Sequence, residues 1–272
     1  MNYAICNETF EGWEHGRVCD TVAALGYTGL EIAPFTLAPL ITDVSSQQRG
    51  ELRKTAEASG LTILGLHWLL AKTEGFQLTS PDEAVRRRTG EYLADLARAA
   101  ADLGGTILVL GSPLQRKIPE GKTHREADGY ALDSLRHCLR ALEQNHVMLC
   151  LEPLTIHETD FLNTAAEGVG MIRRLGHPNV KLHLDVKAMA GERAPIPEVI
   201  RANADHLHHF HANDFNKRGP GFGDVDFKPI LSALQHVRYP GWVSVEVFDY
   251  APDPVTIARE SLRYLRSCEG AV

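Results

Sequence analysis

The sequence predicts an α/β fold of the (β/α)8 barrel class, and three observations support this prediction. Short apolar or β-branched runs alternate with amphipathic stretches along the chain, which is typical of βα units around a parallel sheet. Eight such units fit into 272 residues, close to the ~250 residues of a (β/α)8 barrel. No linker or shift of composition divides the chain, so we expect a single domain over residues 1–272.

Each expected strand is a run of apolar or β-branched residues. The eight runs are Tyr3–Asn7, Thr28–Ala33, Thr62–Trp68, Thr106–Gly111, Val147–Glu152, Lys181–Asp185, Leu207–Asn213 and Trp242–Phe248. A doubly wound open sheet is the alternative fold, but it normally carries a Gly-x-Gly-x-x-Gly turn after its first strand. The residues after Asn7 read Glu-Thr-Phe-Glu-Gly, so this fingerprint is missing there.

The clearest expected helix follows the third strand. Ser80-Pro81-Asp82 offers an N-cap, a proline at the first helical position and an acidic first turn. Apolar residues then recur at helical spacing over Glu83–Leu103, and Gly104-Gly105 ends the helix. A last helix is expected from about Asp253 to Arg266.

Two of the expected loops are long, and the others are short. They are Gly111–Thr123 and Asn213–Val225. Long loops in a compact domain are often functional, so both are candidates for a role at the site.

Charge and cysteine content exclude several classes of protein. The 28 basic and 35 acidic residues give a net charge of −7, and an acidic chain binds nucleic acid or anionic membranes poorly. No apolar run approaches the ~18 residues that span a bilayer. The five cysteines include no Cys-x-x-Cys pair, which indicates free thiols in a reducing compartment. We therefore expect a cytoplasmic protein without a nucleic-acid or membrane partner.

Polar side chains end four successive expected strands. Alternate side chains of a strand face opposite ways, and in a barrel the apolar face packs against the helices. This alternation turns four side chains into the barrel at the rim where such enzymes carry their active sites. The four are Glu152, Asp185, His211 and Glu246.

Three carboxylates in one concave site repel one another and require protons or a cation. Three carboxylate oxygens and one imidazole nitrogen favour a divalent ion such as Mn²⁺, Mg²⁺ or Co²⁺, whereas a structural zinc site would more often offer thiolates. Taken singly, each carboxylate is explained equally well by a structural role as a salt-bridge partner or helix cap. The histidine is explained equally well as a hydrogen-bonded group of the core. Their matching positions on neighbouring strands favour a shared site.

Other residues near the same rim are candidates for substrate binding. His67 and Trp68 end the third expected strand, and aromatic walls are usual in ligand pockets. Glu31 lies near the end of the second strand and could bind substrate hydroxyls. His183 and His209 lie one inward step deeper, as substrate contacts, supports of the rim residues or hydrogen-bonded core groups.

Five short motifs carry a family resemblance. They are Leu151-Glu152-Pro153, Leu184-Asp185, His209-Phe210-His211, Gly219-Pro220-Gly221-Phe222-Gly223 and Val245-Glu246. In combination they resemble the xylose isomerase-like TIM-barrel superfamily, and most closely its sugar phosphate isomerase/epimerase branch, which includes ketose 3-epimerases of the tagatose 3-epimerase type. The resemblance covers nearly the whole chain and is strongest from Val147 to Phe248.

The resemblance implies a role for each of the matching residues. Glu152 and Glu246 would bind the metal and act as the acid/base pair, while Asp185 and His211 would complete the ligand set. Glu158, six positions after the first ligand, would position the substrate or the catalytic carboxylate.

The chain departs from the family pattern at two positions. The tagatose-type enzymes carry a substrate-contacting histidine where this chain has Ala188, and an arginine where it has Lys217 followed by Arg218. The metal and acid/base residues are kept while the substrate contacts change. We therefore expect Lys217 and Arg218 to contact the substrate.

These residues together indicate a metal-dependent isomerase or epimerase acting on a small sugar or sugar derivative. A metal that holds a carbonyl and a neighbouring hydroxyl would stabilise the enediolate left when a carboxylate removes the proton beside the carbonyl. Return of that proton to the other face gives an epimer, and its return to the neighbouring carbon gives an isomer. The alternatives are a lyase or dehydratase on an inosose or keto-sugar, an AP-endonuclease-like nuclease, and a non-catalytic sugar-binding barrel. Enzymes of this branch often form homo-oligomers.

Overall fold

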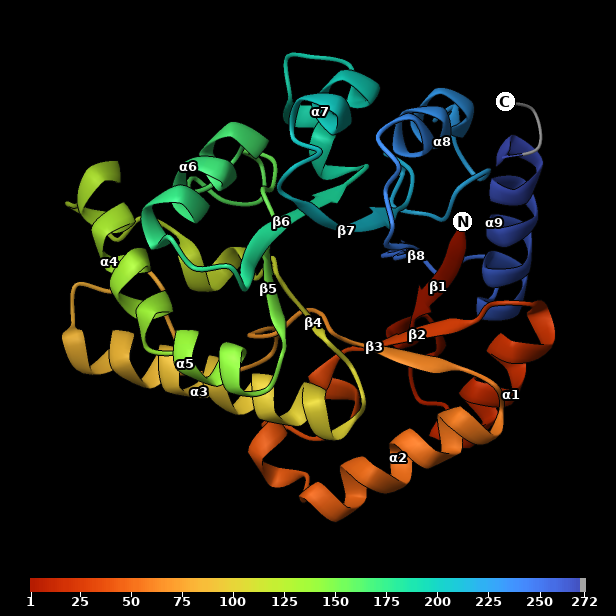
Figure 1. Ribbon diagram of the computed structural model, residues 1–272, viewed down its shortest axis with the longest axis horizontal. Helices are drawn as coiled ribbons and strands as arrows, with labels where there is room; N and C mark the ends of the chain where they lie inside the picture. Colours follow the sequence, from red (N-terminus) through yellow and green to blue (C-terminus); the bar gives the residue numbers. More distant parts are fainter. Residues whose placement is uncertain (270–272) are drawn as a thin grey trace.

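Eight parallel strands close into a barrel in the computed structural model, which describes residues 1–269 (Figure 1). Each strand pairs with the next one along the chain, and β8 pairs with β1. The strands are β1 (Asn2–Cys6), β2 (Gly29–Ile32), β3 (Thr62–Leu66), β4 (Ile107–Leu110), β5 (Met148–Leu151), β6 (Val180–Asp185), β7 (Leu207–Ala212) and β8 (Trp242–Val245). The predicted (β/α)8 barrel is thus confirmed, and each strand lies inside or within one residue of its expected run.

The helices form a ring outside the strands (Figure 1). Most strands are followed by one α-helix, and two short helices occupy the connection from β4 to β5. The helices are α1 (His15–Leu25), α2 (Ser46–Ala58), α3 (Glu83–Asp102), α4 (His124–Arg136), α5 (Leu139–Gln144), α6 (Ala165–Leu175), α7 (Ile196–Ala202), α8 (Phe227–His236) and α9 (Pro254–Glu269). None of them, within the part of the chain described, is long and apolar enough to cross a membrane.

Strand side chains separate into an outer and an inner layer. Outward residues such as Leu184 and Val243 join the large apolar core between barrel and helices. A smaller apolar cluster that includes Leu64, Val109 and Cys150 fills the lower barrel interior. Because this lower layer is apolar, the polar inward side chains gather above it, toward the carboxyl ends of the strands.

The predicted helix after the third strand begins two residues later than expected. Its N-cap is Asp82, whose side chain accepts from the Ala84 N–H at 2.8 Å, so the Ser80-Pro81 prediction was wrong. A carboxylate at this position also interacts favourably with the helix dipole, which Ser80 would not do. The apolar face of α3 is buried as predicted.

Two further loops are long, which the sequence prediction missed. Residues 67–82 connect β3 to α3, and residues 152–164 connect β5 to α6. The expected third strand ran on to Trp68, but pairing ends at Leu66, and Trp68 has a left-handed backbone (φ 52°). Both loops contribute to the pocket described below.

Candidate metal centre and reaction pocket

The four predicted rim residues come together at the carboxyl end of the barrel. Asp185 is the last residue of β6, and His211 lies one residue before the end of β7. Glu152 and Glu246 each follow the last residue of their strand. All four side chains are at least 92% buried. Atoms of Glu152, Asp185 and His211 also lie near one another and His211 contacts Glu246, so these side chains point into the barrel, as side-chain alternation predicts.

The polar atoms of this cluster have the spacing of cation ligands. Atoms of Glu152, Asp185 and His211 lie within 4.8 Å of one another together with an atom of His183, whereas Glu246 belongs to a separate group of this kind with Glu8 and His67. His211 Nδ1 lies 3.2 Å from Glu246 Oε2, yet neither atom has a hydrogen-bond partner among residues 1–269. Buried polar atoms normally find a hydrogen-bond partner, so these two atoms, which contact each other only as an ion pair, are available to a further group.

The charges of the cluster are strongly coupled. Burial, followed by the Glu246 and Asp185 carboxylates, raises the pKa of Glu152 well above its ordinary value. Burial and Glu246 likewise raise the pKa of Asp185 to about 6. Like charges packed this closely disfavour ionisation, and a bound cation would reverse that effect.

His211 and Glu246 form the oppositely charged half of the cluster. Burial lowers the pKa of His211, but Glu31 and Glu246 outweigh it and raise this pKa well above the usual value. Burial raises the pKa of Glu246, but His211 and the Trp68 N–H outweigh it and lower this pKa. Trp68 Nε1 donates to Glu246 Oε1 at 2.6 Å, which fixes the orientation of the carboxylate.

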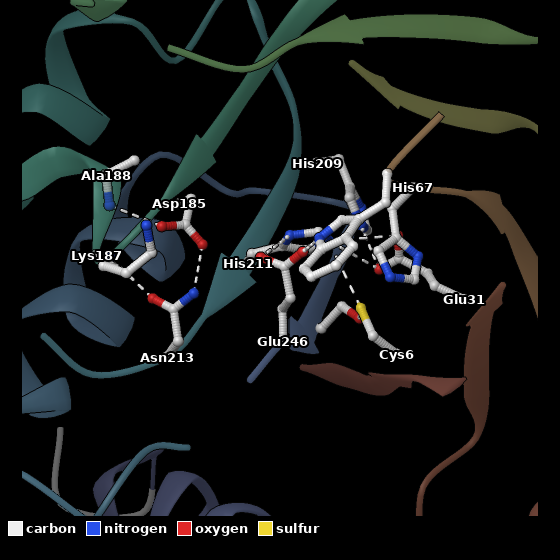
Figure 2. A network of polar contacts seen from close by, with 12 residues as sticks. Cys6, Glu31, His67, Asp185, Lys187, Ala188, His209, His211, Asn213 and Glu246 are labelled. Carbon is white, nitrogen blue, oxygen red and sulfur yellow. Dashed lines mark hydrogen bonds and ion pairs between the residues drawn. The ribbon is translucent and has the colours of Figure 1, made fainter. Parts of the chain in front are cut away.

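A set of neighbouring polar groups holds the cluster in place (Figure 2). Asp185 accepts from Asn213 Nδ2 at 2.5 Å and from the Ala188 N–H at 2.7 Å. Glu31 Oε1 lies 2.7 Å from His209 Nε2 and 3.2 Å from His211 Nε2. Contacts of this kind fix ring orientation and the basicity of a metal-binding histidine.

The structure places Glu31 differently from its predicted position on the substrate surface. It is fully buried beneath the cluster, and both oxygens face His211. Its carboxylate is thus a partner of two histidines. Glu31 comes from β2 and His209 from β7, and these two strands come near each other only because β8 pairs with β1 and closes the barrel.

A pocket of about 300 Å³ opens above the cluster. Glu152, Glu246, Trp68 and Glu158 line it as the sequence analysis expected, and Phe248 lies against Trp68 with ring centroids 5.7 Å apart. Its volume is at the lower end of the ~300–1,000 Å³ of small-molecule sites. The pocket suits one small substrate.

Five other residues that were predicted to contact the substrate do not line this pocket. Lys217 is exposed, and Arg218 pairs with Asp249 at 2.9 Å. His67 is buried against Glu8 at 2.7 Å. His183 and His209 are fully buried and do not line the pocket. Neither Lys217 nor Arg218 lines the pocket, and their contact with substrate stays a prediction.

Sequence reasoning missed three residues at the site. Lys187 lines the pocket and donates to Glu158 Oε1 at 2.6 Å. Arg116, in the loop after β4, is buried and donates to the Glu152 carbonyl at 2.7 Å. Glu8 follows β1 and pairs with His67. The position of Lys187, two residues after Asp185, was the available signal for it.

A closed (β/α)8 barrel with a buried carboxylate–imidazole cluster at the carboxyl ends of its strands defines an enzyme of the barrel class. The chain belongs to the xylose isomerase-like TIM barrel family, whose model matches residues 19–268. It is 30% identical to D-psicose 3-epimerase of Ruminiclostridium cellulolyticum over 250 residues, covering 90% of this chain and 82% of that protein. It is 31% identical to D-psicose 3-epimerase of Agrobacterium fabrum over 246 residues, covering 87% and 82%.

The solved structures agree with this assignment. A crystal structure of D-psicose 3-epimerase in the presence of D-fructose matches with a TM-score of 0.87 and 25% identity, over 99% of this chain and 100% of that chain. The relatives are sugar epimerases, which are isomerases. The predicted family, its ketose 3-epimerase-like branch and the enzyme class are thereby confirmed.

Proposed function

We propose that the protein is a divalent-metal-dependent sugar epimerase of the ketose 3-epimerase type, which inverts the carbon next to a ketose carbonyl. The observation that carries this proposal is the presence of two carboxylates, Glu152 and Glu246, in the wall of one small pocket. They come from β5 and β8, so they reach the pocket from different sides. The names of the relatives support the reaction class.

The residues present fit a divalent cation. Glu152, Asp185, His211 and Glu246 would hold it, since they supply hard carboxylate oxygens and one imidazole nitrogen. The unpartnered His211 Nδ1 and Glu246 Oε2 atoms support this assignment. Such a donor set suits Mn²⁺, with Mg²⁺, Co²⁺ or Zn²⁺ as alternatives. The ion would act as a Lewis acid that stabilises negative charge on the substrate oxygens.

The two carboxylates would carry the proton. One takes the proton from the carbon beside the carbonyl, and the C–H electron pair forms the double bond of an enediolate. The other returns a proton to the opposite face of the same carbon, which restores the carbonyl and inverts the centre. Trp68 holds one oxygen of Glu246. Lys187 and Glu158 form the polar side of the pocket and would orient the substrate hydroxyls.

The test is deuterium incorporation at C3 of D-fructose and D-psicose in D₂O, with Mn²⁺ present. We expect exchange and interconversion by the parent protein, and a loss of about 10²-fold or more in Glu152→Gln and Glu246→Gln, as general acid–base groups contribute ~10²–10⁴-fold. Glu198→Gln, at an exposed site on α7, is the matched control. Absence of exchange with a wide panel of ketoses would refute the proposal.

The main alternative is a lyase or dehydratase, since loss of a β-hydroxyl from the same enediolate gives a dehydrated product. Formation of an ultraviolet-absorbing enone or dione in the same assay would identify it. A cytoplasmic location, homo-oligomerisation and the absence of a nucleic-acid partner remain predictions.

A further inference from the structure

A second cavity lies next to the reaction pocket at the same end of the barrel. Its volume is about 560 Å³, and the loops after β1 and β2 form most of its wall. Lys72 lines both cavities. The mechanism proposed above uses none of the residues that line this second cavity.

The cavity is preformed rather than a gap between loose loops. Asn7, which is 8% exposed, donates through Nδ2 to Thr36 Oγ1 at 2.9 Å and accepts from the Ala33 N–H at 2.8 Å. These two bonds tie the loop after β1 to the loop after β2. Trp13 packs against the buried ring of Phe10, with centroids 5.3 Å apart, and thereby fixes the far wall.

A continuous row of aromatic rings connects the two cavities. The Phe248 and Trp68 rings, which line the reaction pocket, are stacked with centroids 5.7 Å apart. Trp68 in turn contacts Phe35 of the second cavity at 5.6 Å. A ligand in the reaction pocket can therefore extend along one aromatic surface into the second cavity.

One weak ion pair spans the boundary between the cavities. Lys72 Nζ lies 3.3 Å from Glu11 Oε1 and 4.0 Å above the Phe35 ring. The Lys72 and Glu11 side chains are 57% and 61% exposed, and exposed pairs contribute only ~0–1 kcal/mol. A ligand that hydrogen-bonds both groups can replace this pair at little cost.

The chemistry of the wall selects a neutral, hydroxylated ring. Trp13 and Phe35 offer half-buried aromatic surface, while Glu11, Glu14 and Thr36 offer oxygen acceptors at its edges. Glu11 and Glu14 are balanced by Lys72 and by Arg17, whose guanidinium carbon lies 3.6 Å from the Trp13 ring centroid, so the wall has no excess of positive charge for a phosphate or carboxylate ligand. Aromatic faces with polar groups at the sides suit the apolar faces and equatorial hydroxyls of a sugar.

We infer that the second cavity is a subsite for a second sugar ring, so that the preferred substrate is a keto-sugar carrying a glycosidically linked sugar unit. The inference rests on the proposed function, because the reaction pocket must hold the ketose portion. The ketose would occupy the 300 Å³ pocket, and the linked ring would lie against Trp13 and Phe35.

The test compares D-fructose with isomaltulose and lactulose, two neutral disaccharides that contain a fructose unit. Deuterium exchange next to the carbonyl is followed by NMR for the metal-loaded protein. We expect kcat/KM to be at least tenfold higher for one of the disaccharides than for D-fructose. In Trp13→Ala this advantage should fall to within threefold, while kcat/KM for D-fructose changes less than twofold.

Two further variants guard against a general loss of structure. Glu11→Trp places a bulky ring at an exposed position of the cavity and should selectively weaken the disaccharide reaction. Arg87→Ala removes a side chain that is 58% exposed on α3 and lines neither cavity, so it should change neither reaction. The melting temperature of each variant confirms that it is folded.

The outcomes separate the subsite from the proposed function. Exchange of D-fructose with no advantage for either disaccharide would overturn the subsite and leave the epimerase proposal standing. Equal losses for D-fructose and the disaccharide in Trp13→Ala, in a folded protein, would also overturn it. If neither D-fructose, the disaccharides nor any other ketose exchanged, the proposed function would fail and the subsite with it.

Discussion

Lys187 shows how one side chain can organise the polar side of the pocket. Its ammonium contacts Glu158 at 2.6 Å and lies 4.9 Å from the centroid of the Phe248 ring. Only 13% of the Lys187 side chain is exposed. Burial raises the pKa of Glu158, but the bond from Lys187 outweighs this effect and lowers it. The ion pair thus joins the loop after β5 to the loop after β6. Lys187 directly precedes Ala188, the position at which the resembled enzymes carry a histidine.

Replacing Lys187 tests this role. In Lys187→Met, Glu158 loses its cation and its fixed orientation, so we expect KM for the ketose to rise about tenfold with a smaller change in kcat, because one charge-assisted hydrogen bond contributes ~1.5–3 kcal/mol. Lys187→Arg should restore part of the loss. Steady-state kinetics checks both, with Lys117→Met as a control at an exposed position. An unchanged KM in Lys187→Met would contradict the role.

Gly111 follows strand β4 directly and lies against Glu152 of the candidate metal centre. A Cβ atom at this position would lie 2.2 Å from Glu152 Oε2, far inside van der Waals contact. The glycine therefore leaves room for the Glu152 carboxylate on the neighbouring strand. We expect Gly111→Ala to displace that carboxylate.

Gly111→Ala should weaken Mn²⁺ binding at least tenfold, since a misplaced ligand costs ~1.4 kcal/mol or more. Titration calorimetry or the EPR signal of free Mn²⁺ measures the affinity. Gly129→Ala, in α4, is the matched control because an added Cβ there meets no atom within 4 Å. Wild-type affinity in Gly111→Ala would show that Glu152 does not depend on this space.

His208 is the one histidine of β7 that faces away from the barrel interior. Burial, together with His209 and Lys181, lowers its pKa from 6.5 to about 4. A histidine with a depressed pKa in the folded state binds fewer protons than in the unfolded chain between these values. Protonation of His208 therefore does not affect the free energy of unfolding above about pH 6.5, and it destabilises the fold increasingly as the pH falls toward 4.

His208→Gln should reduce this loss of stability. We expect the free energy of unfolding of the parent protein, relative to the variant, to fall by about 1–3 kcal/mol between pH 6.5 and pH 4, the upper value following from ~1.4 kcal/mol per unit of pKa shift. Urea unfolding at several pH values measures it. Parallel pH profiles for the two proteins would contradict the assignment.

At the scale of the whole molecule, the site depends on closure of the barrel. The His209–Glu31 contact joins residues 178 positions apart, and so does the Trp68–Glu246 contact. The pairing of β1 with β8 completes the ring of strands that makes both contacts possible. A ligand that holds several of these strands should therefore stabilise the entire fold.

Metal addition and removal test this coupling. Mn²⁺ at 100 times its Kd should stabilise the protein by ~2.7 kcal/mol and raise Tm on the order of 5 °C, and EDTA should reverse the shift. In Asp185→Asn the shift should be lost or much reduced. Differential scanning calorimetry measures it, without any need for turnover. The same shift in parent and variant would place the ion elsewhere.

The sequence allowed the residues at the rim of the barrel to be predicted better than those in its interior and in the loops. The rim residues Glu152, Asp185, His211 and Glu246 could be placed by side-chain alternation, because that alternation is a local property of each strand. Lys187 was missed because a residue beyond the strand end follows no such period. Glu31 was assigned to the substrate because its partners lie on β7, which comes near β2 only once the barrel is closed.

The amino-acid sequence by itself determined the number of βα units, the inward faces of the strands and the carboxylate–imidazole composition of the rim, since periodicity and residue type are local. Tertiary structure alone decided which atoms meet: the pairing of Trp68 with Glu246, the burial of Arg116 and the second cavity beside the pocket. These contacts join loops that are distant in the sequence, and their geometry follows from barrel closure and loop packing, which no local pattern encodes.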